Sequence, residues 1–422
     1  MGLFVGSTVW SCWKQSHGWR EKARAGLEEE ALRQNAPDGC NREQGIWYHH
    51  EVADMMLLCG LVGRANGSDF SAGYWSRLES MLGFIASMMD VAGNVPMIGD
   101  SDDAVMVRFV PDHDFPVFKS LLATGAVLFK RGDFAAKAGQ FDYKSRWLLG
   151  DDGEARFTEL LRDSGQKSAG FRRAFPDGGY YILGKDFDTE REVKLIADAG
   201  PLGYLSIAAH GHADALSVVL SIGGQEFLID PGTYAYHTER KWRDYFKGTS
   251  AHNTVRVDRL DQSVSGGNFM WLKHAKATCE KFEINNDCDV FEGVHDGYLR
   301  LKDPVTHRRT VSLEKLENRM VVRDNLDCKS GHFAEIFWHF AESCAVEIRP
   351  GRVTVRSGGV FLDMTMPEST WEPRLFRGDE DLPLGWVSRR FDCKEPVSTI
   401  VWSGGVSGPT ELVTVFRYQF EQ

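Results

Sequence analysis

The sequence contains 422 residues and carries a formal net charge of −11 at pH 7, a length that fits two or three domains. Hydrophobic residues make up 42% of the chain and 12 tryptophans are among them, so a disordered chain is excluded. The acidic balance argues against a general nucleic-acid binder, and no apolar run approaches the ~20 residues that span a bilayer. If the substrate is an anion, the positive charge that binds it must be local to a cleft.

Residues 1 to about 125 are expected to be helical. Apolar residues recur four positions apart over 19–31, and the segment from Ile46 places Tyr48, Val52, Met55 and Cys59 on one helical face. A third helix is expected from Tyr74 to about Val91, and residues 113–132 show one more short helical pattern. The apolar stripe expected on the third helix is Leu78, Met81, Leu82, Ile85 and Met88.

After about Gly170 the sequence changes to short β-branched runs separated by Gly, Asp or Asn turns. Because these runs recur without helical segments between them, an antiparallel sandwich fits better than a doubly wound sheet. The domain boundary is expected within 150–170, where the sequence suggests loops at Asp151, Asp152, Gly153, Ser164 and Gly165. The predicted organisation is a helical domain over 1–150 and an antiparallel β-sheet domain over 165–422. The expected strands lie within 180–184, 193–200, 216–224, 227–232, 253–258, 308–314, 319–324, 345–350 and 353–359.

The densest chemical signal is a set of His and Asp residues between 210 and 254. His210 and His212 stand two positions apart and are expected to point to opposite faces, so they are not expected to share a metal. His212, Asp230 and His252 lie on three successive expected β segments and could form a zinc site with a water as fourth ligand. The alternative is that they satisfy backbone groups, with Asp230 before Pro-Gly as an ordinary turn residue.

Two further clusters have competing interpretations. Tyr48, His49 and His50 at a helix start could be acid/base groups, or Tyr48 could pack against Trp47 while His50 and Glu51 are solvated. The loop Ile98-Gly-Asp-Ser-Asp-Asp103 could bind a cation, although it lacks the Gly and the distal Glu of an EF-hand loop. Carboxylates that cap and brace the loop are the preferred interpretation.

Four segments together resemble the heparinase II/III-like polysaccharide lyases. They occur in the family's order, cover most of residues 30–275, and read PDGCNREQGIWYHHEVAD, VPMIGDSDDA, HGHADALSVVLSIGGQEFLIDPGTYAY and WRDYFKGTSAHNTVRVDRLDQS. The resemblance implies a partial (α/α) toroid followed by an antiparallel β-sandwich domain. It also implies β-elimination on a uronate-containing, acidic polysaccharide.

The resemblance assigns residues to roles. It implies that Tyr48 is the catalytic acid/base, that His210 is an accessory catalytic residue, and that a structural zinc is bound by His212, Asp230 and His252. Tyr234 and Tyr236 are reserve candidates for the second proton transfer. Arg243 could contact an anionic sugar, or could be a strand-edge arginine paired with Asp244 or Glu239.

The resemblance also raises expectations about the start of the chain. The family's carboxylate-neutralising Asn and His come from an earlier toroid helix, so the chain is expected to begin in the middle of the toroid, and His49 or His50 could replace that pair. An uncovered toroid face would favour a homo-oligomer. The family suggests a periplasmic or secreted protein, although the first residues show no signal-peptide pattern.

Three functions are therefore compared. The leading one is a polysaccharide lyase. The second is a catalytically impaired relative that acts as a zinc-braced carbohydrate-binding module. The third is a zinc hydrolase that uses His212, Asp230 and His252 with an open water position.

Overall fold

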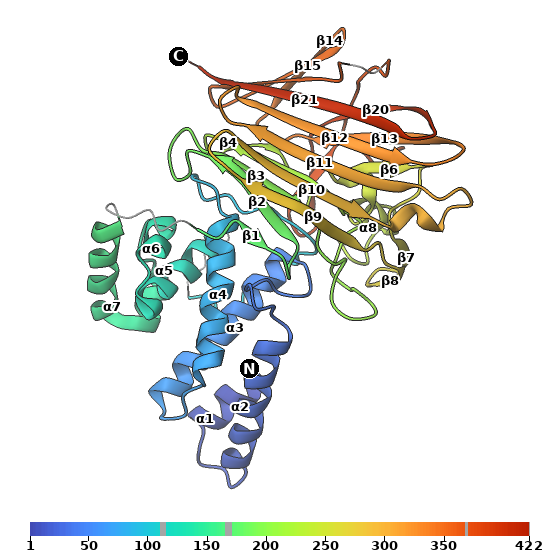
Figure 1. Ribbon diagram of the computed structural model, residues 1–422. Coiled ribbons are helices and arrows are strands. Elements are labelled where there is room, and N and C mark those ends of the chain that lie inside the picture. Colours follow the sequence, from blue (N-terminus) through green and yellow to red (C-terminus); the bar gives the residue numbers. More distant parts are fainter. Residues whose placement is uncertain (110–114, 165–170, 368–369, 422) are drawn as a thin grey trace. The chain divides into compact units, whose positions relative to one another are not determined.

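The computed structural model describes residues 1–109, 115–164, 171–367 and 370–421. The chain forms two compact units (Figure 1). The helical unit comprises Met1–Arg42, Trp47–Met89 and Ala104–Gly178. The β unit comprises Glu43–Ile46, Asp90–Asp103 and Gly179–Gln422. No helix in the described ranges combines the length and the hydropathy that crossing a bilayer requires.

The helices of the first unit follow the apolar periodicity of the sequence. On α4, the side chain of Ser71 caps the helix by accepting a hydrogen bond from the Tyr74 N–H at 3.2 Å. The predicted stripe of this helix is buried over its whole length, which confirms it. The described elements are α1 (Gly2–Val9), α2 (Ser16–Arg33), α3 (Ile46–Ala65), α4 (Ala72–Met88), α5 (Val117–Phe129), α6 (Gly132–Ala138), α7 (Tyr143–Ser164) and the short strand β1 (Ala174–Phe175).

One expectation for this unit was met only in part, and another was wrong. On the face expected for α3, Cys59 is buried but Tyr48, Val52 and Met55 are only half-buried, and Ala53, Met56 and Leu57 are buried instead. Residues 151–153, expected as a loop, are helical within α7, whose interruption is confined to Gly150 at φ 69° and ψ −172°. The expected loop residue Gly165 and the start of the 113–132 pattern lie outside the described residues.

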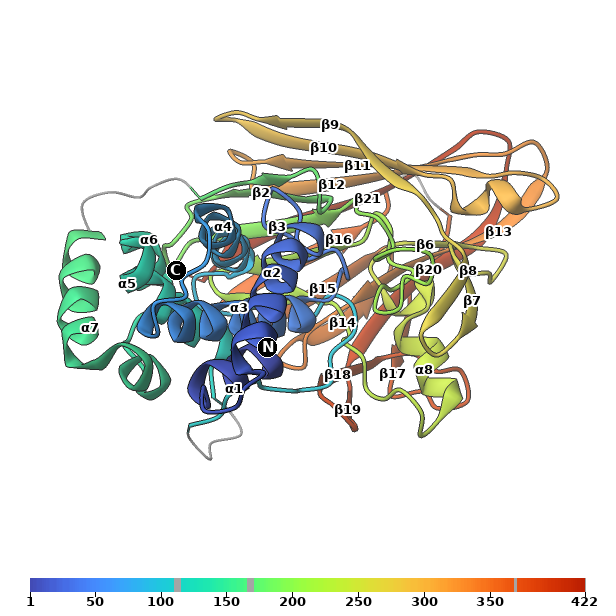
Figure 2. The ribbon, with the colours of Figure 1, turned by 90° about the horizontal axis from the view of Figure 1, so that it is seen from below.

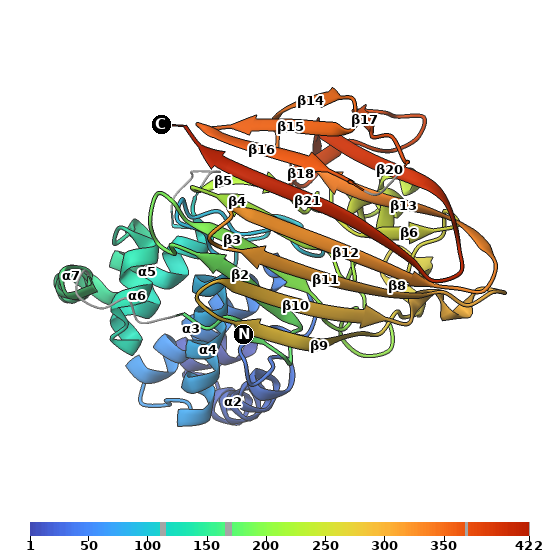
Figure 3. The same cartoon turned by 45° about the horizontal axis from the view of Figure 1, so that its top comes forward.

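The β unit consists of antiparallel sheets, as predicted. A broad sheet of eight strands dominates the described part (Figure 3), in the order β14–β15–β16–β21–β12–β11–β10–β9. A four-stranded sheet runs in the order β17–β20–β13–β6, and β2 to β5 pair in sequence order. Two hairpins, β7–β8 and β18–β19, complete the described pairings.

The first strands are β2 (Tyr180–Lys185), β3 (Val193–Asp198), β4 (Val218–Ile222), β5 (Gln225–Leu228), β6 (Val255–Val257), β7 (Val264–Gly267), β8 (Met270–Lys273), β9 (Ala277–Ile284), β10 (Cys288–His295), β11 (Thr306–Glu314) and β12 (Arg319–Asp327). The later strands are β13 (Gly331–His339), β14 (Ala345–Arg349), β15 (Arg352–Ser357), β16 (Val360–Thr365), β17 (Arg374–Arg377), β18 (Trp386–Arg390), β19 (Cys393–Pro396), β20 (Ser398–Ser407) and β21 (Thr410–Phe420). The helical elements of this unit are α8 (Arg240–Phe246), η1 (Thr249–Ala251) and η2 (Gly297–Arg300).

The core of the β unit lies between sheets. Along β10, buried and half-buried residues alternate, which is the pattern of a strand with one face on a core. Trp338 on β13 packs edge-on against Phe416 on β21 at 4.9 Å, and Tyr181 on β2 lies 5.5 Å from Phe291 on β10. Both smaller sheets therefore pack against the broad sheet, as in a β-sandwich.

Two short segments from the first hundred residues belong to the β unit. The Ile46 N–H donates to the Ile98 carbonyl at 2.9 Å, and the Asn94 side chain donates to the Gly224 carbonyl at 3.0 Å. Gly99 has φ +69°, and a Cβ there would lie 2.2 Å from the Gln44 carbonyl oxygen, so only glycine fits. These contacts fix Asp100, the next residue, inside the β unit.

The helical unit contains a buried ion pair with a testable consequence. Lys144 Nζ lies 2.6 and 2.7 Å from the two carboxylate oxygens of Asp54, and both side chains are buried. Lys144→Met should destabilise the protein by about 3–5 kcal/mol at pH 7, because it leaves a buried carboxylate without its cation. Lys137→Met, which removes a half-buried lysine that donates to the Met89 carbonyl at 3.1 Å, is the matched control.

Burial already raises the pKa of Asp54 despite the opposing effect of Lys144, and removal of Lys144 should raise this pKa further. The folded variant then holds a proton that the unfolded chain releases, so its deficit in the free energy of unfolding should shrink as pH falls. Urea unfolding at pH 7 and pH 5 measures this. Equal stability of Lys144→Met and wild type at pH 7 would contradict the assignment.

Candidate active site and metal cluster

A buried carboxylate, Asp100, organises the candidate site of the β unit. Its Oδ2 accepts a hydrogen bond from Arg243 Nη2 at 2.7 Å, and its Oδ1 bonds Arg243 Nη1. Burial alone would raise the pKa of Asp100, but the guanidinium and the hydrogen bonds from two histidines hold it well below its usual value. Asp100 is therefore a fixed negative charge. This agrees with the bracing interpretation of the 98–103 loop.

Both histidines of the His210-Gly-His212 segment converge on Asp100. His210 Nδ1 lies 3.2 Å from Oδ2, and His212 Nε2 lies 3.0 Å from Oδ1. The prediction that the two side chains point to opposite faces was wrong. Residues two apart in an extended segment share a face, and here the segment is a turn between β3 and β4 in which both rings reach Asp100. His210 remains half-buried, and its Nε2 lies 3.8 Å from a carboxylate oxygen of Glu43.

His212, Asp230 and His252 come together as the sequence suggested. One potential ligand atom from each residue lies within 4.8 Å of the others, and all three residues are buried. They lie on loops, not on strands as expected: His212 before β4, Asp230 after β5 and His252 directly after η1. Side chains on loops at strand ends can converge on one point. Side chains on three neighbouring strands of a flat sheet converge less easily.

The hydrogen bonding of the cluster fits a metal. His212 donates from Nε2 to Asp100, and His252 Nδ1 lies 3.2 Å from Asp230 Oδ2. The remaining ring nitrogens, His212 Nδ1 and His252 Nε2, are buried and have no hydrogen-bond partner among the described residues. Two imidazole nitrogens and a carboxylate are a donor set that zinc accepts, and a carboxylate behind a ligating histidine orients it. These three residues could hold a metal ion.

Two more carboxylates lie next to this cluster. Burial raises the pKa of both Asp198 and Asp214. Repulsion from Asp214 and Asp230 adds to the rise at Asp198, and repulsion from Asp230 adds to it at Asp214, where His252 and His212 act in the opposite direction. Such a concentration of buried negative charge is costly unless it is protonated or a cation is nearby. The electrostatics of the pocket therefore favour a cation at the histidines.

Arg243 differs from both sequence interpretations. It lies on α8 and is fully buried, and besides Asp100 it donates from Nε and Nη2 to the Asn268 carbonyl at 2.9 and 2.7 Å. The strand-edge pairing with Asp244 or Glu239 was wrong, because the neighbouring Arg240 takes Asp244. Direct contact of Arg243 with a sugar stays a prediction, and a fully buried guanidinium is poorly placed for it. What the contacts show is that Arg243 positions Asp100.

The two reserve tyrosines have different surroundings. Tyr236 packs against Phe269 at 4.9 Å, and Phe269 also contacts His210 at 6.0 Å, so Tyr236 borders the site. Tyr234 packs against Trp242 and Phe246 in an apolar cluster, and burial raises its pKa. A proton-transfer role for either remains a prediction.

In the helical unit, Tyr48 is half-buried in the first turn of α3. His49 is buried: its Nδ1 accepts from the Asn41 N–H at 3.2 Å, and its Nε2 lies 3.0 Å from the Met81 carbonyl. Burial lowers the pKa of His49 to about 4. Its proposed substrate contact is corrected to a structural role, because both ring nitrogens are engaged. His50 and Glu51, expected to be solvated, are also buried.

Sequence reasoning missed the β7–β8 hairpin as part of the site. The carbonyl of its tip residue Asn268 accepts a hydrogen bond from Arg243, and Asn268 Nδ2 lies 3.0 Å from His237 Nδ1. The next residue, Phe269, contacts both His210 and Tyr236. Figure 2 shows this hairpin beside α8. In the sequence, Ser265-Gly-Gly267 indicates only a turn, and the aromatic Phe269 that follows it is the one signal of the site.

A second grouping, Asp303, Cys328 and His332, also has metal-ligand residue types. Here both nitrogens of His332 contact carboxylates, Asp258 at 2.7 Å and Asp303 at 3.0 Å. Burial alone would lower the pKa of His332, but these two carboxylates raise it. The contacts therefore describe an imidazolium between two acids, and no metal is inferred there.

Comparisons with known proteins follow the same division of the chain. A family model described as heparinase II/III-like, C-terminal, matches residues 170–415, and one described as heparinase II/III N-terminus matches residues 1–113. No curated protein matches the chain.

Similar solved structures include heparan sulfate lyase HepC from Pedobacter heparinus, with a TM-score of 0.74 at 19% identity. The alignment covers 100% of this chain and 59% of HepC. The heparinase III BT4657 gene product has a TM-score of 0.73 at 15% identity, with 99% and 58% covered. A further heparinase III has 0.72 at 15%, with 100% and 60% covered.

The chain thus spans about three fifths of the length of these structures, whose similarity shows the shared fold. The family is shown by the C-terminal model, which alone matches more than half of the residues. The chain belongs to the heparinase II/III-like family of polysaccharide lyases.

Proposed function

We propose that this protein cleaves a uronate-containing, acidic polysaccharide by β-elimination, with Tyr48 and His210 handling the protons. The observation that carries the proposal is the Arg243–Asp100–His210 arrangement, which fixes a half-buried histidine by one nitrogen. A carboxylate that orients a histidine in this way sets which ring nitrogen faces the reaction.

In the proposed reaction a base removes the C5 proton of the uronate, the C4–O4 bond breaks, and an acid protonates O4. The products are an unsaturated uronate end and a free hydroxyl, and no water is consumed. Tyr48 serves as base in its phenolate form and returns the proton as acid. Asp100 binds His210 Nδ1. This leaves His210 Nε2 as the atom that would stabilise negative charge on Tyr48 or on the substrate.

The resemblance of the segment EQGIWYHH to the family supports the assignment of the acid/base role to Tyr48.

We further propose that His212, Asp230 and His252 bind a structural zinc ion. The bound ion would supply positive charge that neutralises the surrounding carboxylates. The family also supports our proposal that the protein works in the periplasm or outside the cell, where such polymers occur.

The first prediction concerns the reaction. Wild type incubated with heparan sulfate, alginate, hyaluronan and a bacterial exopolysaccharide should give rising ultraviolet absorbance from unsaturated uronate with at least one polymer. Tyr48→Phe should lower kcat by roughly 10²–10⁴-fold, because it removes the acid/base hydroxyl. Tyr143→Phe, an exposed tyrosine of the helical unit, is the control.

A flat trace with every polymer, from folded and metal-loaded protein, would sink the lyase proposal. Retained polysaccharide binding without product would then identify a carbohydrate-binding module.

Arg243 gives a second prediction. Arg243→Lys keeps the charge but loses the paired hydrogen bonds to Asp100, so His210 should be less well fixed. We expect kcat to fall by about 10²-fold with a much smaller change in KM. Arg240→Lys, on the same helix but exposed, should leave both unchanged. An unchanged kcat for Arg243→Lys at intact fold would show that Asp100 needs no such fixing.

The metal prediction is measured on protein purified without chelator. Elemental analysis should find one zinc per chain, lost in His212→Ala and His252→Ala but kept in the control His274→Ala. Stripping the metal should lower Tm by roughly 5–10 °C, because ligand binding stabilises the fold. Lost activity with unchanged Tm would instead support a zinc hydrolase.

A further inference from the structure

The β unit contains a pocket of about 500 Å³ that the proposed reaction does not use. This volume lies within the range of small-molecule sites. Its floor is one face of the four-stranded sheet β17–β20–β13–β6, and its other walls come from α8, Ser250 and the 379–384 loop.

Strand register explains the floor. Glu335 on β13 stands opposite Arg256 on β6 and Ser403 on β20, which forms one row across the sheet. In the next row Phe337 stands opposite Val401, and Val401 stands opposite Arg374 on β17. Residues two apart on a strand share a face, so these two rows line the same hollow.

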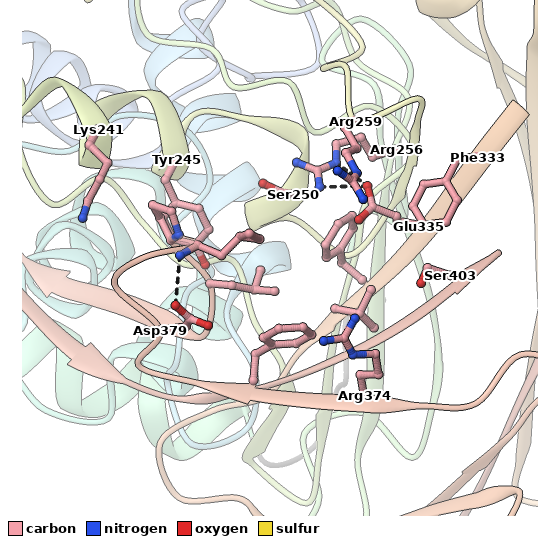
Figure 4. A pocket seen from close by; sticks show the side chains of 16 residues that line it. Lys241, Tyr245, Ser250, Arg256, Arg259, Phe333, Glu335, Arg374, Asp379 and Ser403 are labelled. Atoms are coloured by element: carbon pink, nitrogen blue, oxygen red, sulfur yellow. Dashed lines mark hydrogen bonds and ion pairs between the residues drawn. The ribbon is translucent and has the colours of Figure 1, made fainter.

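Four cations line this pocket, against two carboxylates. Figure 4 shows Arg256 and Arg259 beside each other at one side of the pocket, with Arg374 and Lys241 at other parts of its wall. Arg256 is paired with Glu335 at 2.8 Å. Within the described ranges, neither Arg259 nor Arg374 has a hydrogen bond or ion pair to a carboxylate.

Each arginine of the pocket lies over a phenylalanine ring. The guanidinium carbons of Arg256, Arg259 and Arg374 lie 5.1, 5.5 and 5.1 Å from the rings of Phe337, Phe333 and Phe376. At these distances the rings attract the guanidinium charge by cation–π contact. Such a contact does not use the N–H donors, so Arg259 and Arg374 can still bind an anion through paired hydrogen bonds.

From this geometry we propose that the pocket, whose lining includes neither Tyr48 nor His210, is a second saccharide-binding site for a carboxylated or sulfated sugar unit of the polymer. This inference rests on the proposed function for the nature of the polymer. Arg259 and Arg374 bind the anionic substituent, and the phenylalanine rings contact the apolar face of the sugar.

The pocket is cationic although the chain as a whole is acidic. The protein carries 60 acidic and 49 basic residues, so its average surface repels a polyanion. A pocket with an excess of cations is where such a polymer can be held. A second contact on the same chain raises the effective concentration of polymer at the first.

Isothermal titration of the full chain with a sulfated unsaturated heparin disaccharide tests the proposal. Arg259→Gln/Arg374→Gln should weaken binding at least tenfold, or remove one site from the stoichiometry where the probe also occupies the Tyr48 site. The control Arg356→Gln/Arg417→Gln removes two exposed arginines of the broad sheet, one of them also stacked on a phenylalanine, and should bind as wild type does. Unchanged Tm shows that the variants are folded.

Sodium sulfate and neutral cellobiose separate the sources of affinity, and both should bind at least tenfold more weakly than the disaccharide. Equal binding of sulfate would identify a free-anion site, and equal binding by the double variant or no binding by wild type would likewise overturn the proposal. The Tyr48→Phe variant should keep the site intact. Failure of the lyase assay therefore leaves this measurement unaffected, and the two proposals fail separately.

Discussion

The candidate site depends on one ion pair, that between Asp100 and Arg243. A buried carboxylate is tolerated only when it is paired and hydrogen-bonded, and Asp100 has a guanidinium on both oxygens. Because its charge is fixed, Asp100 can hold two histidines at once: His210 toward Glu43, and His212 toward the metal cluster. The catalytic proposal and the metal proposal thus share a single anion, and a change at Arg243 is expected to reach both.

A second buried hydrogen-bond network, around Arg309 and Asp324, fixes the segments next to the metal-ligand candidates. Arg309 binds both oxygens of Asp324 at 2.7 and 3.0 Å and also donates to the carbonyls of Leu216 and Asn253. The Asn253 amide in turn donates to the Val218 and Ile229 carbonyls. His252 and Asp230, one residue away from Asn253 and Ile229, are therefore held by hydrogen bonds to the sheets, which compensates for their place on loops.

Local patterns in the sequence predicted the features that short stretches of chain determine, namely the buried faces of helices and strands. The stripe of α4 and the β-branched runs of β2, β3 and β4 determine which faces are buried, and the structure confirms them. The partners of Asp100 could not be predicted, because Arg243 is 143 positions away and that pairing arises from tertiary packing. For the same reason α8 was missed: in a charged, aromatic seven-residue segment, packing decides the conformation more than propensity does. The family resemblance pointed to His212, Asp230 and His252, which the structure brings together, but not to Asp100 behind His212.

Helix α8 joins the two sites argued for the β unit. Residues four apart share a helix face, so Arg243 and Lys247 form one face and Lys241 and Tyr245 another. The first face binds Asp100 and the β7–β8 hairpin, through the Asn268 and Gly267 carbonyls. The second lines the cationic pocket. Because α8 contributes to both, a polymer bound in the pocket would contact the same element that positions Asp100. We expect the pocket to act by holding the polymer rather than by switching the chemistry.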